Sequence, residues 1–309
     1  MYLGIDIGTS SVKAVIVDDK DNVVEQASAP LNVSRPQAGW SEQNPADWWS
    51  ATNVAVKALP AKERKAVRAV GLSGQMHGAT LLDAADKPLR PAILWNDGRS
   101  EQQCTTLEKT EPRSREITGN IAMPGFTAPK LVWVREHEPA IFKDTRCVLL
   151  PKDYVRLLMT GEKASDCSDA AGTLWLDVAK RRWSPEMLAA SGLNEAHMPR
   201  LVEGSDVSGS LRKEVAADWG MDAVLVAGGG GDNAAGAAGI GVIKPGDAFL
   251  SLGTSGVLFL VTPKFLPNAA KAVHAFCHCL PGVWHQMSVM LSAASCLRWV
   301  TRPAPRVVP

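Results

Sequence analysis

The sequence predicts an α/β protein whose first domain is built on a mixed sheet. The chain opens with two apolar runs, residues 2–7 and 12–17, on either side of a Gly-Thr-Ser turn, which is typical of two strands joined by a tight turn. Apolar runs of strand length then alternate with longer segments of helical spacing. Near residue 227 a short apolar run leads into four consecutive glycines. Strands that alternate with helices in this way favour an α/β domain.

The remaining elements follow in order along the chain. Further strands are expected where apolar residues are bounded by turns, at residues 23–29, 70–73, 81–82, 91–95 and 224–227. We expect the segments at 81–82 and 91–95 to continue the same sheet. Helices are expected where apolar residues recur at helical spacing, at residues 46–59, 62–70, 129–137, 151–159, 184–190 and 211–219.

A short internal repeat predicts a second domain. Residues 7–12 resemble residues 252–257, because each segment places Gly-Thr-Ser between two apolar runs. The second copy is followed by apolar runs at 258–261 and 283–289. Chance similarity is the alternative, since the shared motif is short. We expect a first domain over residues 1–245 and the beginning of a second, similar domain over residues 246–309.

The end of the chain departs from this pattern. Residues 301–309 contain three prolines, which cannot extend the helix that residues 291–300 begin. Three strands and one helix are also too few for a second core of ordinary size. We therefore expect the second domain to be incomplete and the sequence to be aberrant from about residue 298. A disordered tail, a natural truncation and a frameshift are the alternatives.

Composition excludes several classes of function. The 33 basic and 32 acidic side chains give a net charge of +1 and are mixed along the chain, so nucleic-acid binding is not expected. No apolar run has the length of a membrane span, and residues 1–10 lack the basic segment of a signal peptide. The six cysteines are scattered and fit reduced thiols. We expect a cytoplasmic protein without a membrane partner. The oligomeric state is open, and a homodimer is one expectation.

One cluster of cysteines and histidines contains residue types that bind metals. His274, Cys277, His278 and Cys279 lie within six residues. On a strand, Cys277 and Cys279 would share one face while His278 points to the other. Because this divides the ligands, and no second cluster is spaced to complete a tetrahedron, we do not expect a metal here.

The two Gly-Thr-Ser turns are candidates for phosphate binding. Such a turn presents backbone N–H groups and two hydroxyls, which suit a phosphate, although an ordinary hairpin is the alternative. The residues concerned are Gly8, Thr9 and Ser10 with nearby Lys13, and Gly253, Thr254 and Ser255. Asp6 precedes the first turn, where a carboxylate suits Mg²⁺ held through water. No G-x-x-x-x-G-K-[ST] motif is present, so the chain is not a P-loop enzyme.

Asp232 is the candidate catalytic residue. It follows the glycine run 228–231 and begins a stretch of small residues that predicts a helix. Four glycines would let a substrate approach the backbone closely, and a carboxylate there can accept a hydroxyl proton during phosphoryl transfer. A simple N-cap is the alternative interpretation.

Two segments carry the mixture of polar and apolar side chains that sugars require. Gln75-Met76-His77-Gly78 follows a buried strand, and Trp95-Asn96-Asp97-Gly98-Arg99 follows another. Polar groups suit sugar hydroxyls, and a flat or flexible apolar surface suits the C–H face. A structural histidine and a core tryptophan are the alternatives. Because both segments fall at strand ends of one domain, we expect a shared pocket.

These segments resemble a known family. Residues 125–137, GFTAPKLVWVREH, match the first signature of the FGGY carbohydrate kinases throughout. The same family is resembled at residues 4–10, 39–43, 48–49, 166–173 and 251–256. Within the family, residues 75–78 and 94–99 resemble the members that phosphorylate xylulose rather than glycerol. The resemblance runs from Met1 to about residue 297.

The resemblance implies a fold and an activity. The fold would be a ribonuclease-H-like domain of the actin and hexokinase superfamily, with a mixed five-stranded sheet, flanking helices and the start of a second such domain. The activity would be phosphorylation of D-xylulose by ATP and Mg²⁺. Asp232 would take the proton from the sugar's terminal hydroxyl, and Asp6 with Asp232 would lie near Mg²⁺. Met76, His77 and Asn233 would contact the sugar, and the two turns would flank the phosphates.

The same resemblance implies a longer protein. The family's second signature and its glycine-rich adenosine-binding segment have no counterpart in this sequence. We therefore expect this chain to bind ATP poorly and to have little kinase activity by itself. Another sugar kinase of the family, acting on ribulose or a related ketose or polyol, and a non-catalytic sugar-binding fragment are the alternatives. An actin-like or chaperone-like ATPase would not account for residues 76–77 and 96–97.

Overall fold

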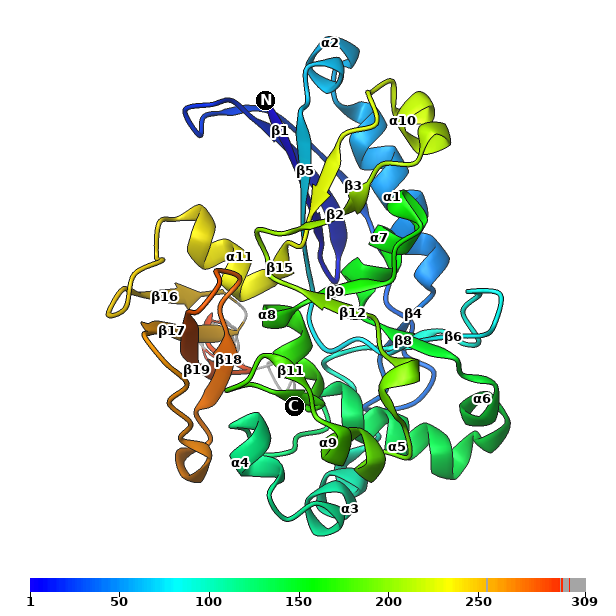
Figure 1. Cartoon of the computed structure of the whole chain (residues 1–309), viewed down its shortest axis with the longest axis vertical. Coiled ribbons are helices and arrows are strands. Elements are labelled where there is room, and N and C mark those ends of the chain that lie inside the picture. The colour runs from blue at the N-terminus through cyan, green and yellow to red at the C-terminus, as the bar shows by residue number, and fades with distance from the viewer. Residues whose placement is uncertain (254, 295, 297–299, 301–309) are drawn as a thin grey trace, which may run out of the picture.

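The main sheet of the protein is mixed and lies at one end of the molecule. The computed structural model in Figure 1 describes residues 1–253, 255–294, 296 and 300. The strands of this sheet are β1 (Tyr2–Ile7), β2 (Ser11–Val17), β3 (Val23–Pro30), β5 (Ala69–Gly74), β13 (Val207–Ser210), β14 (Leu225–Ala227) and β15 (Gly230–Gly231). Their order is β13-β14-β5-β1-β2-β3, and β15 also pairs with β5. The five strands β3-β2-β1-β5-β14 form the expected mixed sheet, and β13 and β15 extend it.

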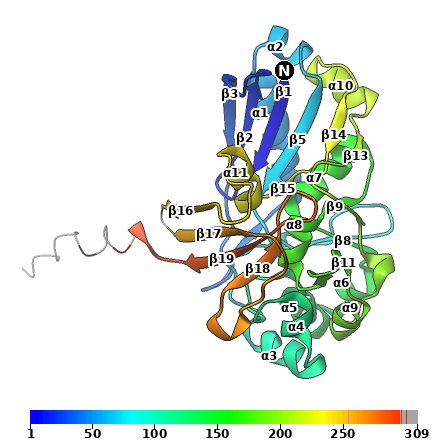
Figure 2. The same cartoon turned by 60° about the vertical axis from the view of Figure 1, so that its left-hand side comes forward.

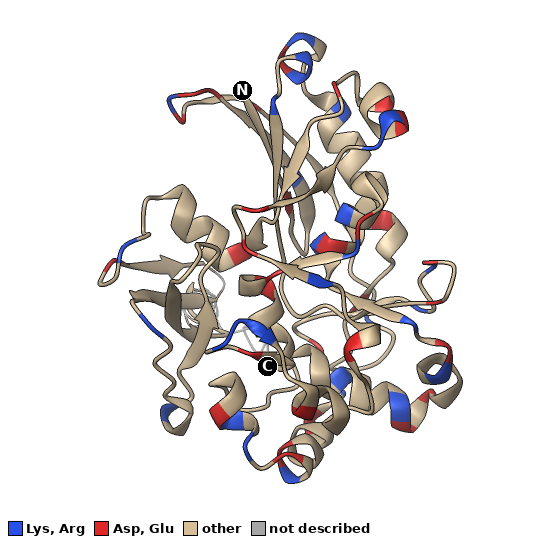
Figure 3. Cartoon of the chain, viewed as in Figure 1, with Lys and Arg blue, Asp and Glu red and all other residues tan. Residues whose placement is uncertain are grey.

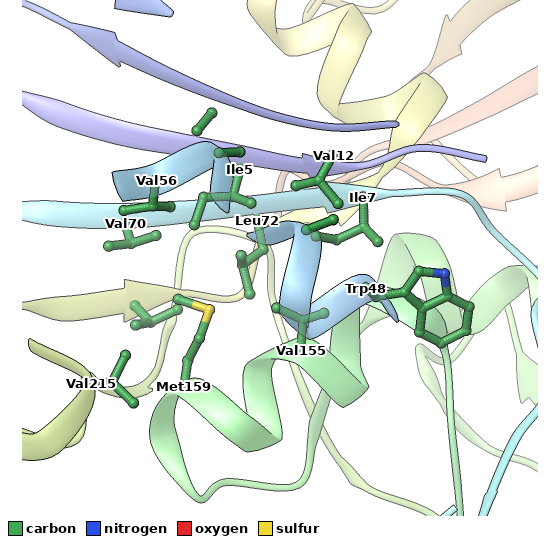
Figure 4. Packing of buried hydrophobic residues seen from close by; sticks show 14 of the residues in the cluster. Ile5, Ile7, Val12, Trp48, Val56, Val70, Leu72, Val155, Met159 and Val215 are labelled. Atoms are coloured by element: carbon green, nitrogen blue, oxygen red, sulfur yellow. The ribbon is translucent and has the colours of Figure 1, made fainter. Parts of the chain in front are cut away.

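One face of this sheet is covered by helices. Strand alternation buries Leu3, Ile5 and Ile7 of β1 on that face. They pack against α1 (Pro45–Ala58) and α7 (Pro151–Thr160), whose Trp48 and Val155 are fully buried in the same cluster (Figure 4). The opposite face of β1 carries small and polar residues and remains open to a cleft.

The strand that leads to the glycine run is interrupted rather than ended. β14 pairs in parallel with the start of β5, and β15 pairs in parallel with its end. Between them, Gly228 and Gly229 leave the ladder. Helix α11 (Asp232–Gly239) follows at once, so Asp232 is its first residue, as the sequence predicts. Because α11 follows β15 directly, Asp232 lies at the face of the main sheet that is open to the cleft.

The expectation that residues 81–82 and 91–95 continue the main sheet is wrong. β6 (Thr80–Leu82) pairs instead with β8 (Cys147–Leu149), and β7 (Ala92–Ile93) pairs with β4 (Glu42–Gln43). The reason is that both edges of β5 are already occupied, by β1 on one side and by β14 and β15 on the other. The chain leaving β5 has no free edge there and must pair elsewhere.

Four of the other helices lie where the sequence predicts them: α2 (Ala61–Lys65), α5 (Thr127–His137), α9 (Pro185–Ala190) and α10 (Lys213–Trp219), although α2 ends at Lys65 and does not reach residue 70. The helices α3 (Glu101–Thr110), α4 (Ser114–Thr118), α6 (Pro139–Asp144) and α8 (Cys167–Ala170) were not predicted. Short 3₁₀ turns are η1 (Ala171–Thr173), η2 (Glu195–His197) and η3 (Ala269–Lys271). α7 illustrates how the sequence limits a helix: it begins at Pro151 and ends before Gly161, whose φ of 84° an L-residue rarely adopts.

The region that the internal repeat predicts as a second domain forms an antiparallel sheet. Its order is β16-β17-β19-β18, with bounds β16 (Ala248–Leu252), β17 (Gly256–Thr262), β18 (His274–Cys277) and β19 (Trp284–Met290). Two pairs of short strands, β9 (Ala164–Asp166) with β12 (Arg200–Val202) and β10 (Leu176–Asp177) with β11 (Arg182–Trp183), complete the list.

This antiparallel sheet shares a core with the first part of the chain. Phe259 and Phe276 pack in one buried cluster with Phe126 of the loop before α5 and with Trp175. Figure 2 shows α11 between the main sheet and this second sheet, in agreement with Figure 1. The boundary near residue 245 stays a prediction. Among the described residues, no helix is long and apolar enough to cross a membrane.

Candidate active site

A cleft of about 720 Å³ lies on the face of the main sheet opposite α1 and α7. Its walls are formed by β1, β2 and β5, by the glycine run and by α11. Gly4 and Gly71 are cross-strand partners in its floor, where the absence of side chains leaves the space open. Asp6 and Asp232 both line this cleft, so the structure brings together the two carboxylates that the sequence singles out.

Asp6 faces the cleft because of strand alternation. Ile5 and Ile7 are buried on the helix side, which turns Asp6 to the other face. There it pairs across the sheet with Lys13 of β2 and Ser73 of β5. Burial raises the pKa of Asp6, while a hydrogen bond from Ser73 and the charge of Lys13 lower it. Lys13 is exposed and lines the cleft, where its charge suits an anionic group.

Asp232 lies at the start of α11, on the other side of the cleft. Its carboxylate accepts hydrogen bonds from the backbone N–H and the side-chain amide of Asn233, at 2.7 and 2.9 Å. Gly231 is the N-cap, so Asp232 does not serve as a cap itself. Desolvation of the carboxylate by the surrounding protein raises the pKa of Asp232 to about 6, and repulsion from Asp6 adds to this, while the Asn233 hydrogen bonds oppose it. A carboxylate with this pKa is suited to general-base chemistry near neutral pH.

The pair of carboxylates also suits a divalent cation. Their repulsion, which raises the pKa of Asp232, would be relieved by positive charge between them. Mg²⁺ commonly binds to one or two carboxylates and completes its shell with water and substrate phosphates. Asp6 and Asp232, which both line this cleft, are therefore of the residue type that fits a magnesium ion.

The first Gly-Thr-Ser turn is tied to the predicted sugar-binding segments by hydrogen bonds. The Thr9 hydroxyl donates to Gln75 Oε1 at 3.1 Å and accepts from Trp95 Nε1 at 3.0 Å. The backbone N–H of Gly8 closes the turn on Ser11 O at 3.0 Å, and Ser10 is exposed at its tip. The Thr9 hydroxyl is thus occupied within the protein, whereas Ser10 remains open to a ligand.

Met76 packs beside the residue that precedes Asp232, and His77 follows it in the chain. A Cβ added to Gly231 would come within 2.9 Å of Met76 Sδ, so Met76 packs directly on the residue before Asp232. A Cβ on Gly172 would come within 2.7 Å of the His77 ring and 2.8 Å of Met76 Cε. The absence of side chains at these two glycines lets Met76 pack against Gly231 and His77 pack against Gly172, and Met76, His77 and Asn233 are not among the residues that line the cleft of Asp6 and Asp232.

The chemistry of His77 is fixed by its neighbours. Nδ1 lies 2.6 Å from the carbonyl oxygen of Gly172, which can only accept, so Nδ1 carries the proton. Burial and the charge of Lys130 lower the pKa of His77 to about 3, which keeps the ring neutral. Nε2 is then an acceptor, suited to the O–H of a sugar. The backbone of His77 has φ of 70°, and its carbonyl accepts from Lys130 Nζ at 2.8 Å and Thr127 Oγ1 at 3.2 Å.

The three residues of segment 95–97 have different surroundings. Trp95 contacts the first turn, as described, and Asn96 is exposed. Asp97 is buried, and its carboxylate accepts from the Ser41 N–H at 2.6 Å and from the Arg99 N–H and guanidinium at 2.7–2.9 Å. With both oxygens engaged, Asp97 holds its loop together. Trp95, Asn96 and Asp97 do not line the cleft that contains Asp6 and Asp232.

The second Gly-Thr-Ser turn joins β16 to β17. The N–H of Gly253 donates to Ser255 O at 2.9 Å, whereas in the first turn the N–H of Gly8 donates to Ser11 O, one residue further along the chain. Gly253 is exposed and Ser255 is half-buried. Thr254 lies outside the described residues, as does the segment from about residue 298, apart from Val300. The hairpin itself agrees with the repeat that the sequence predicts.

Gly228 and Gly229 make close contacts with the protein's own backbone. A Cβ on Gly228 would come within 2.1 Å of Glu203 O, and one on Gly229 within 2.1 Å of Leu72 O. The physical role of Gly228 and Gly229 is therefore to let the loop cross between neighbouring segments and return to β5. Gly229 and Gly230 also line the cleft, and the approach of a substrate to the glycine run stays a prediction.

Some residues of the site were not predicted. Ser73 bonds to Asp6, and alternation along β5 could have revealed it, because Gly71 and Ser73 share the face of Asp6. Gln75 was noticed only as part of a motif, yet its side chain joins the first turn to Gln43. Gly172 and Lys130 act on His77 from distant segments, and no local pattern indicates that contact.

The fold that contains this cleft is that of a known protein family. Residues 1–239 match the N-terminal domain of the FGGY family of carbohydrate kinases, and the chain therefore belongs to this family. It is 59% identical over 303 residues to the xylulose kinase of Escherichia coli (strain K12), covering 98% of this chain and 63% of that protein. It is 60% identical, with the same coverage, to the xylulose kinase of Klebsiella pneumoniae.

A solved structure gives the same result. The chain resembles the crystal structure of a xyloylose kinase from Brucella ovis with a TM-score of 0.94 at 59% identity, over 96% of this chain and 62% of that one. The predicted actin and hexokinase type of fold is thereby confirmed. The chain spans about 63% of the length of these curated relatives.

Proposed function

We propose that this chain supplies the sugar site and the proton acceptor for phosphorylation of D-xylulose by ATP, which would yield D-xylulose 5-phosphate. The observation that carries the proposal is the convergence of Asp6, Asp232 and Met76 on one cleft and its rim. The relatives named above are xylulose kinases, and their identity to this chain of about 60% supports D-xylulose as the substrate.

Each residue of the site has a proposed role in the transfer. Asp232 accepts the proton of the terminal hydroxyl of the sugar as that oxygen bonds to the γ-phosphorus of ATP, and ADP leaves with the electron pair of the broken P–O bond on its β-phosphate oxygen. His77 Nε2 and Asn233 offer an acceptor and an amide to other hydroxyls, and Met76 offers an apolar surface. Mg²⁺ bound by Asp6 and Asp232 would supply positive charge beside the transferred group.

Phosphate contacts are assigned to the two turns. Ser10 at the first turn and Gly253 and Ser255 at the second are open to a ligand, and Lys13 places a positive charge on the cleft wall. Backbone and hydroxyl donors of this kind bind phosphate without a P-loop. The cytoplasmic location and the homodimer stay predictions.

Binding is the first test. Isothermal titration of this chain with D-xylulose, with D-ribulose and glycerol as competitors, should show D-xylulose binding most tightly. A His77→Asn variant, which loses the Nε2 acceptor at this position, should weaken D-xylulose binding by about tenfold. If the unsubstituted chain binds glycerol or D-ribulose more tightly than D-xylulose, the substrate assignment is wrong.

Turnover is the second test. ADP release with ATP, Mg²⁺ and D-xylulose should be measured on this chain and on a fusion of its residues 1–292 to the remaining length of the Escherichia coli relative. The fusion should turn over D-xylulose, and Asp232→Asn in the fusion should lower turnover by about 10²–10⁴. The same assay of the unfused chain tests the prediction that it has little activity by itself. A fusion whose turnover survives Asp232→Asn would refute the role of Asp232.

A further inference from the structure

A network of charged side chains is buried behind the glycine run. Lys152 Nζ, at the start of α7, lies 2.7 Å from Asp153, 2.7 Å from Asp166 and 3.0 Å from Asp169. All four side chains are fully buried. Figure 3 shows acidic and basic segments meeting in the interior at α7 and α8, while the other charges lie mostly at the periphery.

This network is not a metal site. The carboxylates of Asp153, Asp166 and Asp169 are close enough together to hold a cation. The Lys152 ammonium already occupies the position between them, within 3.0 Å of each. Burial raises the pKa of Asp169 well above its ordinary value, and repulsion from the other two carboxylates adds to this, while Lys152 opposes it.

One arm of the network reaches the beginning of the glycine run. Arg156, one turn further along α7, bonds to Asp153 Oδ1 at 3.2 Å. Its guanidinium also donates to the carbonyl oxygens of Ala227 at 2.9 Å and Gly228 at 2.6 Å. The guanidinium therefore holds the chain where β14 leaves the main sheet.

The other arm reaches the end of the glycine run. Ser168 Oγ donates to Asp166 Oδ1 at 2.5 Å and accepts from the N–H of Gly231 at 3.1 Å. Gly231 is the residue before Asp232. The two arms are joined through Asp153, Lys152 and Asp166, so one continuous set of polar contacts spans the loop from its first carbonyl to its last N–H.

The loop needs such external support because it has no side chains of its own. Residues 228–231 are all glycine, the residue type with the greatest conformational freedom. Gly229 adopts φ of 79°, which only glycine readily tolerates. The position of Asp232 across the cleft from Asp6 therefore depends on contacts to the loop backbone, and two of the partners, Arg156 and Ser168, belong to this network.

We propose that Ser168 and Arg156, fixed by the buried Lys152 cluster, are positioning residues that set the place of Asp232 in the cleft. This inference rests on the proposed role of Asp232 as proton acceptor. Burying so many charges carries a desolvation cost that apolar residues would avoid, and a gain in conformational precision at the loop is a physical reason to retain them.

A pair of serine variants tests the proposal. Ser168→Ala removes the acceptor of the Gly231 N–H, and Ser165→Ala is the matched control. Ser165 is equally buried on neighbouring β9, and its hydroxyl has no hydrogen-bond partner among the described residues. Hydrogen exchange of the Gly231 amide, followed by NMR on this chain without any ligand, should be about tenfold faster in Ser168→Ala and unchanged in Ser165→Ala.

Kinetics separate positioning from general stability. In the fusion described above, Ser168→Ala should lower kcat about tenfold while the KM for D-xylulose changes much less. Arg156→Met should act in the same direction, and if it fails to fold, the serine pair still decides. Equal Gly231 exchange in the two serine variants, or an equal loss of kcat in both, would overturn the proposal. Failure of the unsubstituted chain to bind D-xylulose would instead refute the proposed function and leave the exchange result intact.

Discussion

Replacing Lys130 by methionine should change how the stability of the protein depends on pH. The Lys130 side chain is fully buried in α5, and its ammonium donates to the carbonyl oxygens of His77 at 2.8 Å and Gly125 at 2.7 Å. Burial lowers the pKa of Lys130 from 10.5 to about 7, although Asp97 opposes this. Between about pH 7 and pH 10.5, Lys130 is therefore mostly protonated in the unfolded chain and mostly neutral in the folded chain.

The sign and size of the effect follow from this difference. Stability rises with pH wherever the unfolded state binds more protons, so Lys130 destabilises the fold most at and below pH 7 and least above pH 10.5. At about 1.4 kcal/mol for each pKa unit, the full effect is about 5 kcal/mol. The part regained between pH 7 and pH 9 is about 2 kcal/mol.

Urea unfolding at pH 7, 8 and 9 measures this effect. Subtracting the free energy of unfolding of Lys130→Met from that of the unsubstituted chain removes titrations that both share. The difference should shift by about 2 kcal/mol in favour of the unsubstituted chain from pH 7 to pH 9. Lys109→Met, at an exposed position of α3, controls for loss of a lysine charge. A difference that stays constant over this range would show that Lys130 is not desolvated, and the reasoning would fail.

Further predictions concern the cleft and its loop. Asp232→Asn should lower turnover of the fusion by about 10²–10⁴ while calorimetry shows D-xylulose still bound, and loss of binding instead would contradict a purely catalytic role. Gly229→Ala should lower the free energy of unfolding by more than about 3 kcal/mol, because φ is 79° and a Cβ would lie 2.1 Å from Leu72 O. Gly236→Ala, where nothing lies within 4 Å, should raise it by up to about 1 kcal/mol, and urea unfolding distinguishes the two. Trp95→Phe removes the indole bond to the first turn and should lower the free energy of unfolding by about 1 kcal/mol, and an unchanged urea midpoint would show that this bond adds nothing.

The candidate site could be predicted where chemistry follows local order. Asp6 stands between Ile5 and Ile7 in an alternating strand, so burial of the isoleucines alone directs its carboxylate to the other face. Asp232 begins a helix directly after a glycine run, and both features are readable in the sequence. Such predictions succeed because backbone geometry fixes the direction of a side chain relative to its immediate neighbours.

Other assignments depended on partners that local order does not reveal. Asp97 looked like a sugar ligand, but Ser41 and Arg99 occupy its oxygens. The hydroxyl of Thr9 looked free for phosphate, but Gln75 and Trp95 engage it. A side chain's availability to a ligand depends on every group folded against it, and the sequence lists those groups without placing them.

The sequence by itself determined the class of fold, the two hairpin turns, the start of α11 and the two carboxylates of the cleft. These depend on periodicity and turn chemistry, which act over a few residues. Only the tertiary structure decided that the strands after β5 pair elsewhere, because both edges of β5 were taken. It also decided that the glycine run is held from behind by Arg156 and Ser168. The physical reason is that edge occupancy and the burial of charge depend on the whole arrangement of distant segments.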